Sequence, residues 1–110
     1  MNTETDAGES GRWRTAPVAC SLTRDDQTNQ MASWREALDG AAVAVIPDGR
    51  RLTVPVSRAA AVAGLAAAEQ ACCPFFDFRL HLETPVLHLE VRAPAAAADL
   101  LAALFLGREE

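Results

Sequence analysis

The sequence lacks lysine, and all ten of its basic residues are arginine. We attribute the exclusive use of arginine, and the abundance of alanine, to a coding bias rather than to function. Runs of basic residues are also missing, and the formal net charge is −5. Proteins that bind nucleic acids usually present clustered basic residues to the phosphates. The composition therefore argues against nucleic acid as a partner.

Long apolar runs are absent as well. No stretch reaches the length that spans a bilayer, and residues 1–10 are acidic without the apolar core of a secretory signal. The three cysteines are too few, and odd in number, for a disulfide-stapled secreted scaffold. We therefore expect a cytoplasmic protein with no membrane partner, whose thiols bind metal, carry out redox chemistry or simply pack.

The chain of 110 residues is 50% hydrophobic, which suits one compact domain. Residues 1–17 are polar and rich in small residues, and they are predicted to form a disordered tail. Residues 18–107 are predicted to form a single domain. Its first element is a strand over residues 18–23, in which alternation places Cys20 on the apolar face.

The next elements follow from periodicity and from turn residues. Helical spacing of apolar residues predicts a helix that begins near Thr23 and ends at Gly40. Two apolar segments, residues 41–46 and 52–56, flank a Pro-Asp-Gly turn and are predicted to pair as a hairpin. A second helix should then begin at Ser57.

That second helix should run to about Cys72, because Pro74 cannot continue it. A second hairpin, residues 76–83 with 87–92, follows from strict alternation on both sides of a Thr-Pro turn. Its predicted register pairs Asp77 with Arg92, Arg79 with Glu90, and His81 with His88. Pro94 should open a third helix.

This order of elements predicts an α+β fold, a two-layer sandwich. The first six elements match a ferredoxin-like βαββαβ core, which the last strand and helix would extend at one edge. We expect the helices on one face of the sheet and a partly wet second face. In such a core, strand 18–23 ends at the sheet edge where the second helix ends, so Cys20 should approach Cys72 and Cys73.

Two adjacent thiols and a carboxylate occur together in one segment, Glu69-Gln70-Ala71-Cys72-Cys73-Pro74. Residues three and four apart share a helix face, so Glu69 should overlie both cysteines. It also lies on the apolar stripe, where a carboxylate needs a partner. An arginine, the Trp34 indole N–H, a protonated group or a metal ion could fill that role.

Thiolates select soft ions such as Cu(I), Zn(II), Hg(II) and As(III). Three cysteines do not complete a four-thiolate zinc site, so a two- or three-coordinate ion fits better. We therefore predict a non-catalytic soft-metal or metalloid module that uses Cys72 and Cys73, with Cys20 as a possible third ligand and Glu69 orienting or neutralising the site. His81 and His88 should project from the opposite face of the sheet.

Two alternatives remain open. A thiol-redox protein would cycle a disulfide between Cys20 and either Cys72 or Cys73, because two adjacent cysteines bridge each other only through a strained ring. A purely structural domain would dimerise through a sheet edge or the wet face. The common enzyme signatures for phosphate loops, serine hydrolases and zinc proteases are absent.

The segments Ala19-Cys20-Ser21-Leu22-Thr23 and Glu69-Gln70-Ala71-Cys72-Cys73-Pro74-Phe75 resemble those of a group of small uncharacterised bacterial proteins, with A-C-x-L-T and E-Q-x-C-C-x-F patterns. Similar E-x-x-C-C-x-F segments resemble C-terminal extensions of some MerR-type metal-responsive regulators. The resemblance implies an effector-type module with Cys20, Glu69, Cys72 and Cys73 in the matching positions. DNA binding is not implied, because this chain lacks the winged helix-turn-helix of those regulators.

Overall fold

The computed structural model describes residues 24–105. The predicted tail and the predicted strand over residues 18–23, with Cys20, lie outside the described residues. The described elements, in chain order, are α3 (Arg24–Ala37), β1 (Ala42–Ile46), β2 (Gly49–Pro55), the 3-10 turn η1 (Val56–Arg58), α4 (Ala59–Cys72), β3 (Asp77–Glu83), β4 (Val86–Arg92), the 3-10 turn η2 (Ala95–Ala97) and α5 (Ala98–Phe105).

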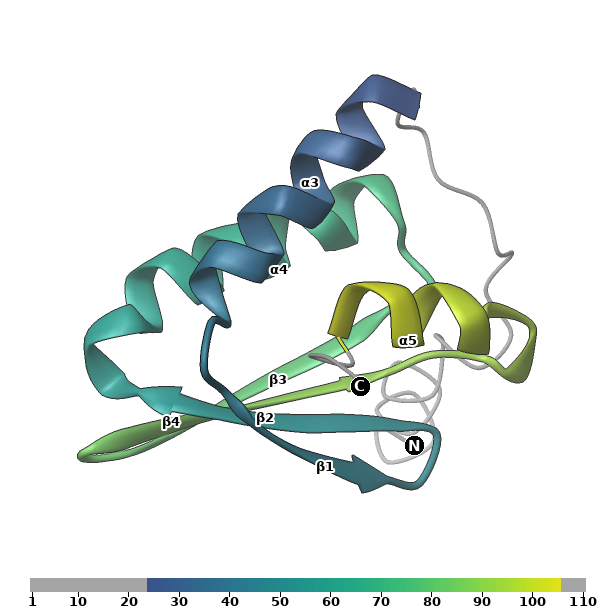
Figure 1. Ribbon diagram of the computed structural model, residues 1–110. Helices are drawn as coiled ribbons and strands as arrows, with labels where there is room; N and C mark the ends of the chain where they lie inside the picture. Colours follow the sequence, from purple (N-terminus) through teal and green to yellow (C-terminus); the bar gives the residue numbers. More distant parts are fainter. Residues whose placement is uncertain (1–23, 106–110) are drawn as a thin grey trace, which may run out of the picture.

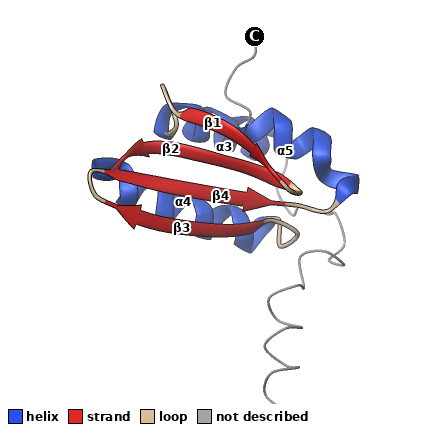
Figure 2. Cartoon of the chain, turned by 90° about the horizontal axis from the view of Figure 1, so that it is seen from below, coloured by secondary structure: helices blue, strands red, loops and turns tan. Residues whose placement is uncertain are grey.

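The strands form one antiparallel sheet in the order β1-β2-β4-β3. Helices α3, α4 and α5 all lie on one side of this sheet (Figure 1). The opposite side is not covered by any described helix, as the view from below shows (Figure 2). The predicted two-layer α+β architecture, with helices on one face, is confirmed.

The position of β4 corrects one prediction. We expected this strand to extend an edge, but it lies between β2 and β3, where the ferredoxin-like order would place the first strand. Burial explains the choice, because the inward residues Leu87, Leu89 and Val91 are all fully buried. A strand with a continuous apolar face buries the most apolar surface at the centre of a sheet, and this burial stabilises the fold.

The β3–β4 hairpin has the predicted register, with Asp77 opposite Arg92, Arg79 opposite Glu90 and His81 opposite His88. The ion pairs, however, do not all run across the hairpin. Arg79 contacts Asp77 at 3.0 Å and Arg92 contacts Glu90 at 3.1 Å, each within one strand. Residues two apart on a strand share a face, so such pairs compete with those directly across.

The β1–β2 hairpin has a tighter turn than the sequence suggested. Ile46 pairs directly with Gly49, so β2 begins earlier than predicted and only Pro47 and Asp48 form the loop. Asp48 adopts a positive φ of 64°, a conformation that aspartate tolerates better than most residues. Gly49 lies against the backbone of β4 and is buried.

Arg58, the N-cap residue of α4, connects this helix to the end of α3, and α4 begins two residues after the predicted start at Ser57. Ser57 lies in η1, and neither η1 nor α4 has a side-chain hydrogen bond at its N-cap. Arg58 Nη1 instead donates to the Ala37 carbonyl at 3.1 Å and to the Asp39 carbonyl at 2.6 Å. It thereby satisfies carbonyl groups that the end of α3 leaves without intrahelical partners.

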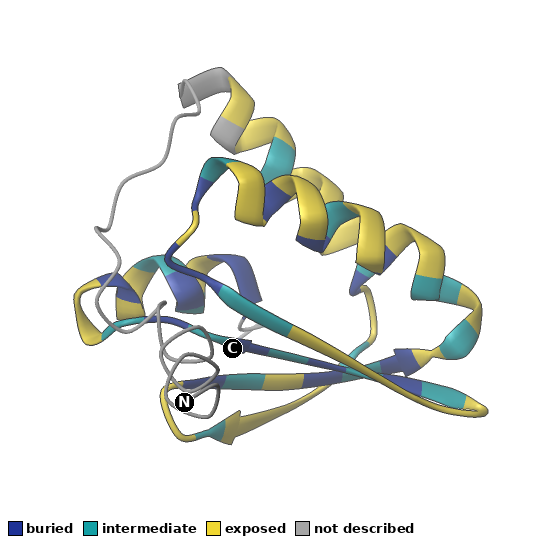
Figure 3. Ribbon diagram, turned by 180° about the vertical axis from the view of Figure 1, so that it is seen from behind, coloured by how far each residue is buried: buried dark blue, intermediate teal, exposed yellow. Residues whose placement is uncertain are grey.

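One hydrophobic core lies between the helix layer and the sheet. Buried residues line the inner surfaces of the elements, whereas the outer surfaces of the helices are mostly exposed (Figure 3). Its largest fully buried side chains are Trp34, Phe75, Phe76, Phe105, Leu52, Leu87 and Leu89. Within the described range, no helix has the length and apolar character needed to cross a membrane.

Candidate thiol site at the end of helix α4

Helix α4 ends in a tight turn that carries both neighbouring cysteines. Cys72 is its last residue, and Cys73 leaves the helical region with φ −130° and ψ 78°. The Cys73 N–H still donates to the Glu69 carbonyl at 2.7 Å, and the Phe76 N–H donates to the Cys73 carbonyl at 3.2 Å. Pro74 forces this exit, because a residue before proline disfavours the helical conformation. The predicted end of the helix is confirmed.

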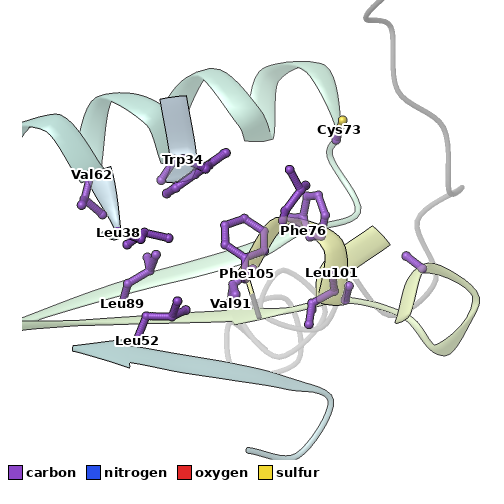
Figure 4. Packing of buried hydrophobic residues seen from close by; sticks show 14 of the residues in the cluster. Trp34, Leu38, Leu52, Val62, Cys73, Phe76, Leu89, Val91, Leu101 and Phe105 are labelled. Atoms are coloured by element: carbon purple, nitrogen blue, oxygen red, sulfur yellow. The ribbon is translucent and has the colours of Figure 1, made fainter. Parts of the chain in front are cut away.

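The two cysteines differ in exposure and in chemical state. Cys72 is a free thiol and is half-buried. Cys73 has 1% of its surface exposed and is disulfide-bonded. It lies at the end of α4 and belongs to the cluster of buried core residues (Figure 4). Cys20, the third predicted member of the site, lies outside the described residues. A sulfur in a disulfide has no thiolate to offer a metal ion, so in this state Cys72 is the available thiol of the pair.

Glu69 is buried one turn before Cys73, with 2% of its surface exposed. The Trp34 indole N–H donates to Glu69 Oε1 at 2.9 Å, a bond between α3 and α4 inside the core. The sequence offered this indole as one possible partner, and that prediction is confirmed. Trp34 is itself held edge-to-face against Phe105, with ring centroids 4.9 Å apart. The Glu69 carboxylate is therefore fixed by the core.

The described residues do not assemble a metal site by themselves. Within residues 24–105, no three His, Cys, Asp or Glu side chains are grouped so that they could hold a metal ion. Glu69 is engaged with Trp34, and its role as a metal ligand stays a prediction. A third protein ligand for Cys72 and Cys73 would have to come from outside the described range, as the prediction for Cys20 requires.

The two histidines lie on the open face of the sheet, away from the thiols. Neighbours of His88 along β4, Leu87 and Leu89, are buried under the helices, so His88 and its partner His81 project to the other side. The two rings lie 5.7 Å apart. As predicted, the histidines do not join the thiol site.

Polar contacts on this open face lower the pKa of two glutamates. His88 Nε2 bonds to Glu83 Oε1 at 2.8 Å, and this hydrogen bond, with the charges of both histidines, holds the pKa of Glu83 below its usual value. Arg51 donates to Glu90 Oε2 at 2.8 Å, which lowers the pKa of Glu90. Arg51 belongs to β2, and the sequence did not predict that β2 pairs with β4.

A pocket on the helix side of β1 was also missed by sequence reasoning. We call it the α3–β1 pocket, and its volume is about 480 Å³. It lies between the end of α3, the strands β1 and β2, and the end of α5, and it is lined by Trp34, Arg35, Leu38, Asp39, Gly40, Ala41, Val43, Leu52, Ala103 and Leu104. No local pattern identifies such a pocket, because its walls come from four separate elements.

In comparisons by sequence and by structure, no family model, curated protein or solved structure matches the chain.

Proposed function

We propose that this chain is a thiol–disulfide redox protein in which Cys73 forms and breaks a disulfide with Cys20. The disulfide on Cys73 is the observation that carries the proposal. Cys20 is the partner we propose, because Cys72 is a free thiol and the chain has three cysteines. A disulfide that forms and breaks is compatible with a reducing cytoplasm, where a permanent disulfide would be unusual.

The reaction is an exchange of two electrons with an external dithiol. A thiolate of the reductant attacks one sulfur of the protein disulfide, and the other sulfur leaves as a thiolate and takes up a proton. The second thiol of the reductant then attacks the mixed disulfide. The protein gains two thiols, and the external dithiol becomes a disulfide. In the reverse direction, the protein dithiol reduces a disulfide of its partner.

The surroundings of Cys73 favour one reversible pairing over random oxidation. Its backbone is held by hydrogen bonds at both its N–H and its carbonyl. Its side chain is buried, while the neighbouring thiol of Cys72 is half-buried. A direct Cys72–Cys73 bond would need a strained ring, so the distant cysteine is the better partner. In this proposal Cys72 is not a member of the redox couple.

The test compares the wild type with two matched variants, Cys72→Ser and Cys73→Ser. Each protein is equilibrated with mixtures of reduced and oxidised dithiothreitol or glutathione, alkylated with a maleimide and analysed by peptide mass spectrometry. We expect wild type and Cys72→Ser to gain and lose two alkylatable thiols together, at one midpoint. Cys73→Ser should show no such coupled pair.

Two outcomes would contradict the redox proposal. In the first, both thiols of Cys72→Ser stay alkylatable under oxidising mixtures. In the second, the disulfide resists dithiothreitol for as long as the protein stays folded, in which case the bond would be structural. Far-ultraviolet circular dichroism checks that each variant keeps the α+β fold.

A second candidate function concerns the reduced protein, and the free thiol of Cys72 favours it. After reduction, Cys72 and Cys73 would stand side by side at the end of α4 as two thiols. Adjacent thiolates chelate a soft ion such as Hg(II), As(III), Cu(I) or Zn(II), and Cys20 would add a third sulfur. Glu69 would then support the helix end rather than bind the ion, since its carboxylate accepts the Trp34 bond.

Native mass spectrometry of the anaerobically reduced protein, titrated with each ion, tests this second candidate. We expect one ion per chain, bound by wild type and lost in Cys72→Ser and in Cys73→Ser. The Cys72→Ser variant separates the two functions, because it should keep the redox couple and lose the ion. Adducts that form equally well without the cysteines would rule out the metal site.

A further inference from the structure

Among the described strands, β1 forms one edge of the sheet, and its own sequence carries no charge. It occupies one end of the strand order and pairs with β2. Its sequence, AVAVI, has no charged residue and no proline, and four of its five residues are exposed. Natural edge strands are usually protected by charges, prolines or bulges. The opposite edge, β3, carries Asp77, Arg79 and Glu83, whereas β1 has none of these protections.

The helix side of β1 carries an exposed valine and adjoins the α3–β1 pocket, whose lining includes Arg35 and Asp39 as well as apolar residues. Val43 pairs with the buried Leu52 and lines the α3–β1 pocket. Val45 lies two residues further on the same face of the strand, and 76% of its surface is exposed. An exposed valine therefore lies on the same face of β1 as Val43, which belongs to the wall of the pocket.

We propose that a second copy of this chain pairs antiparallel with β1, about a two-fold axis at Ala44. Directly opposite residues in antiparallel strands point to the same face, so such an axis must pass through a residue. Centring it on Ala44 is the one choice that pairs all five residues of the strand. The two sheets then join into one continuous sheet.

This register sets Val43 opposite Val45 of the partner subunit, and a two-fold axis repeats the contact. Cross-strand pairs of β-branched residues stabilise a sheet. Because Val43 lines the α3–β1 pocket, Val45 of the partner subunit then packs against a residue of the pocket wall. Each copy thus contributes both an exposed Val43 and an exposed Val45 to the contact, so that the edge is complementary to itself.

The absence of charge favours a second copy over a different protein. A two-fold contact brings the strand against itself, and any charged residue near the axis would meet its own copy. β1 has no charge that would oppose this contact. A five-residue edge is small beside a standard interface, so we expect a reversible, concentration-dependent dimer. The dimer does not depend on the thiol chemistry proposed above.

Sedimentation velocity under reducing conditions, over a wide range of protein concentrations, tests the proposal. The informative variant is Val45→Arg, and Leu82→Arg is its matched control on the other edge strand, where Leu82 is 59% exposed. We expect wild type and Leu82→Arg to dimerise with similar affinity. Val45→Arg should raise the dimer dissociation constant by at least about tenfold, because it places two charges in the contact.

Three results would overturn the proposal. The wild type could stay monomeric up to about 1 mM, or Val45→Arg could dimerise as well as the wild type. Leu82→Arg could abolish the dimer, which would place the interface on β3. Thermal melts confirm that the variants fold. If Val45→Arg melts early, Val45→Thr keeps the side-chain shape and provides the same comparison with a polar group.

Discussion

The substitution Gly49→Ala is expected to lower the free energy of unfolding by about 2–4 kcal/mol. A Cβ atom at this position would lie 1.8 Å from the Val91 carbonyl oxygen and 2.8 Å from the Val91 carbonyl carbon. Both atoms belong to the backbone of β4, which is hydrogen-bonded to β2 on one side and to β3 on the other. The clash therefore cannot be relieved without opening the centre of the sheet.

Thermal and urea unfolding followed by circular dichroism would measure this loss. For a domain of this size, it should lower the melting temperature by more than about 10 °C. Gly64→Ala is the matched control, because a Cβ there meets nothing within 4 Å and alanine favours the helix. That variant should gain about 0.5–1 kcal/mol. Equal melting temperatures for Gly49→Ala and wild type would contradict the close approach of β2 and β4.

The requirement at Gly49 illustrates which parts of the fold the sequence could and could not predict. The β3–β4 hairpin was predictable in register, because alternation and complementary charges lie within one short stretch of chain. The contact of Gly49 with Val91 joins residues that are far apart in the sequence. It depends on β4 being central, and that follows from the burial of a whole apolar face rather than from any local pattern.

The candidate site also has features that the sequence could predict and features that it could not. Pro74 marked the end of α4, and the helical phase of Glu69 predicted a buried carboxylate in need of a partner. Both signals are local, and both predictions are confirmed. The sequence could not choose Trp34 from the other possible partners, because that choice depends on how α3 crosses α4. The sequence likewise could not predict that Cys72 is a free thiol while Cys73 is disulfide-bonded, because the two residues are adjacent and identical.

The bond between Trp34 and Glu69 leads to the second large expected effect. Trp34→Phe should lower the free energy of unfolding by about 2–4 kcal/mol. Trp34 is fully buried, so the smaller ring leaves a cavity among the aromatic side chains. The substitution also removes the N–H that bonds to Glu69 Oε1 at 2.9 Å, and it leaves a buried carboxylate without that donor. Urea unfolding would measure the loss.

A double-mutant cycle separates the hydrogen bond from the cavity. Glu69→Leu alone leaves the indole N–H without its hydrogen-bond acceptor. Trp34→Phe combined with Glu69→Leu removes both polar partners. We expect the double variant to be more stable than the sum of the single losses implies, by about 1–3 kcal/mol. Glu69→Gln is the matched control, since its amide oxygen can still accept from the indole. Strictly additive losses would show that the bond contributes nothing to stability.

The same variants connect this core bond to the thiols. The Glu69 carbonyl accepts from the Cys73 N–H, so the residue whose side chain is anchored by Trp34 also holds the turn that carries both cysteines. Loss of the anchor should let the end of α4 open locally, because helix ends unfold more readily than the helices they terminate. Alkylation of Cys72 should then be faster in Trp34→Phe than in Glu69→Gln, under conditions where both remain folded. Equal rates would mean that the turn is held by Pro74 and its own backbone, independently of the core.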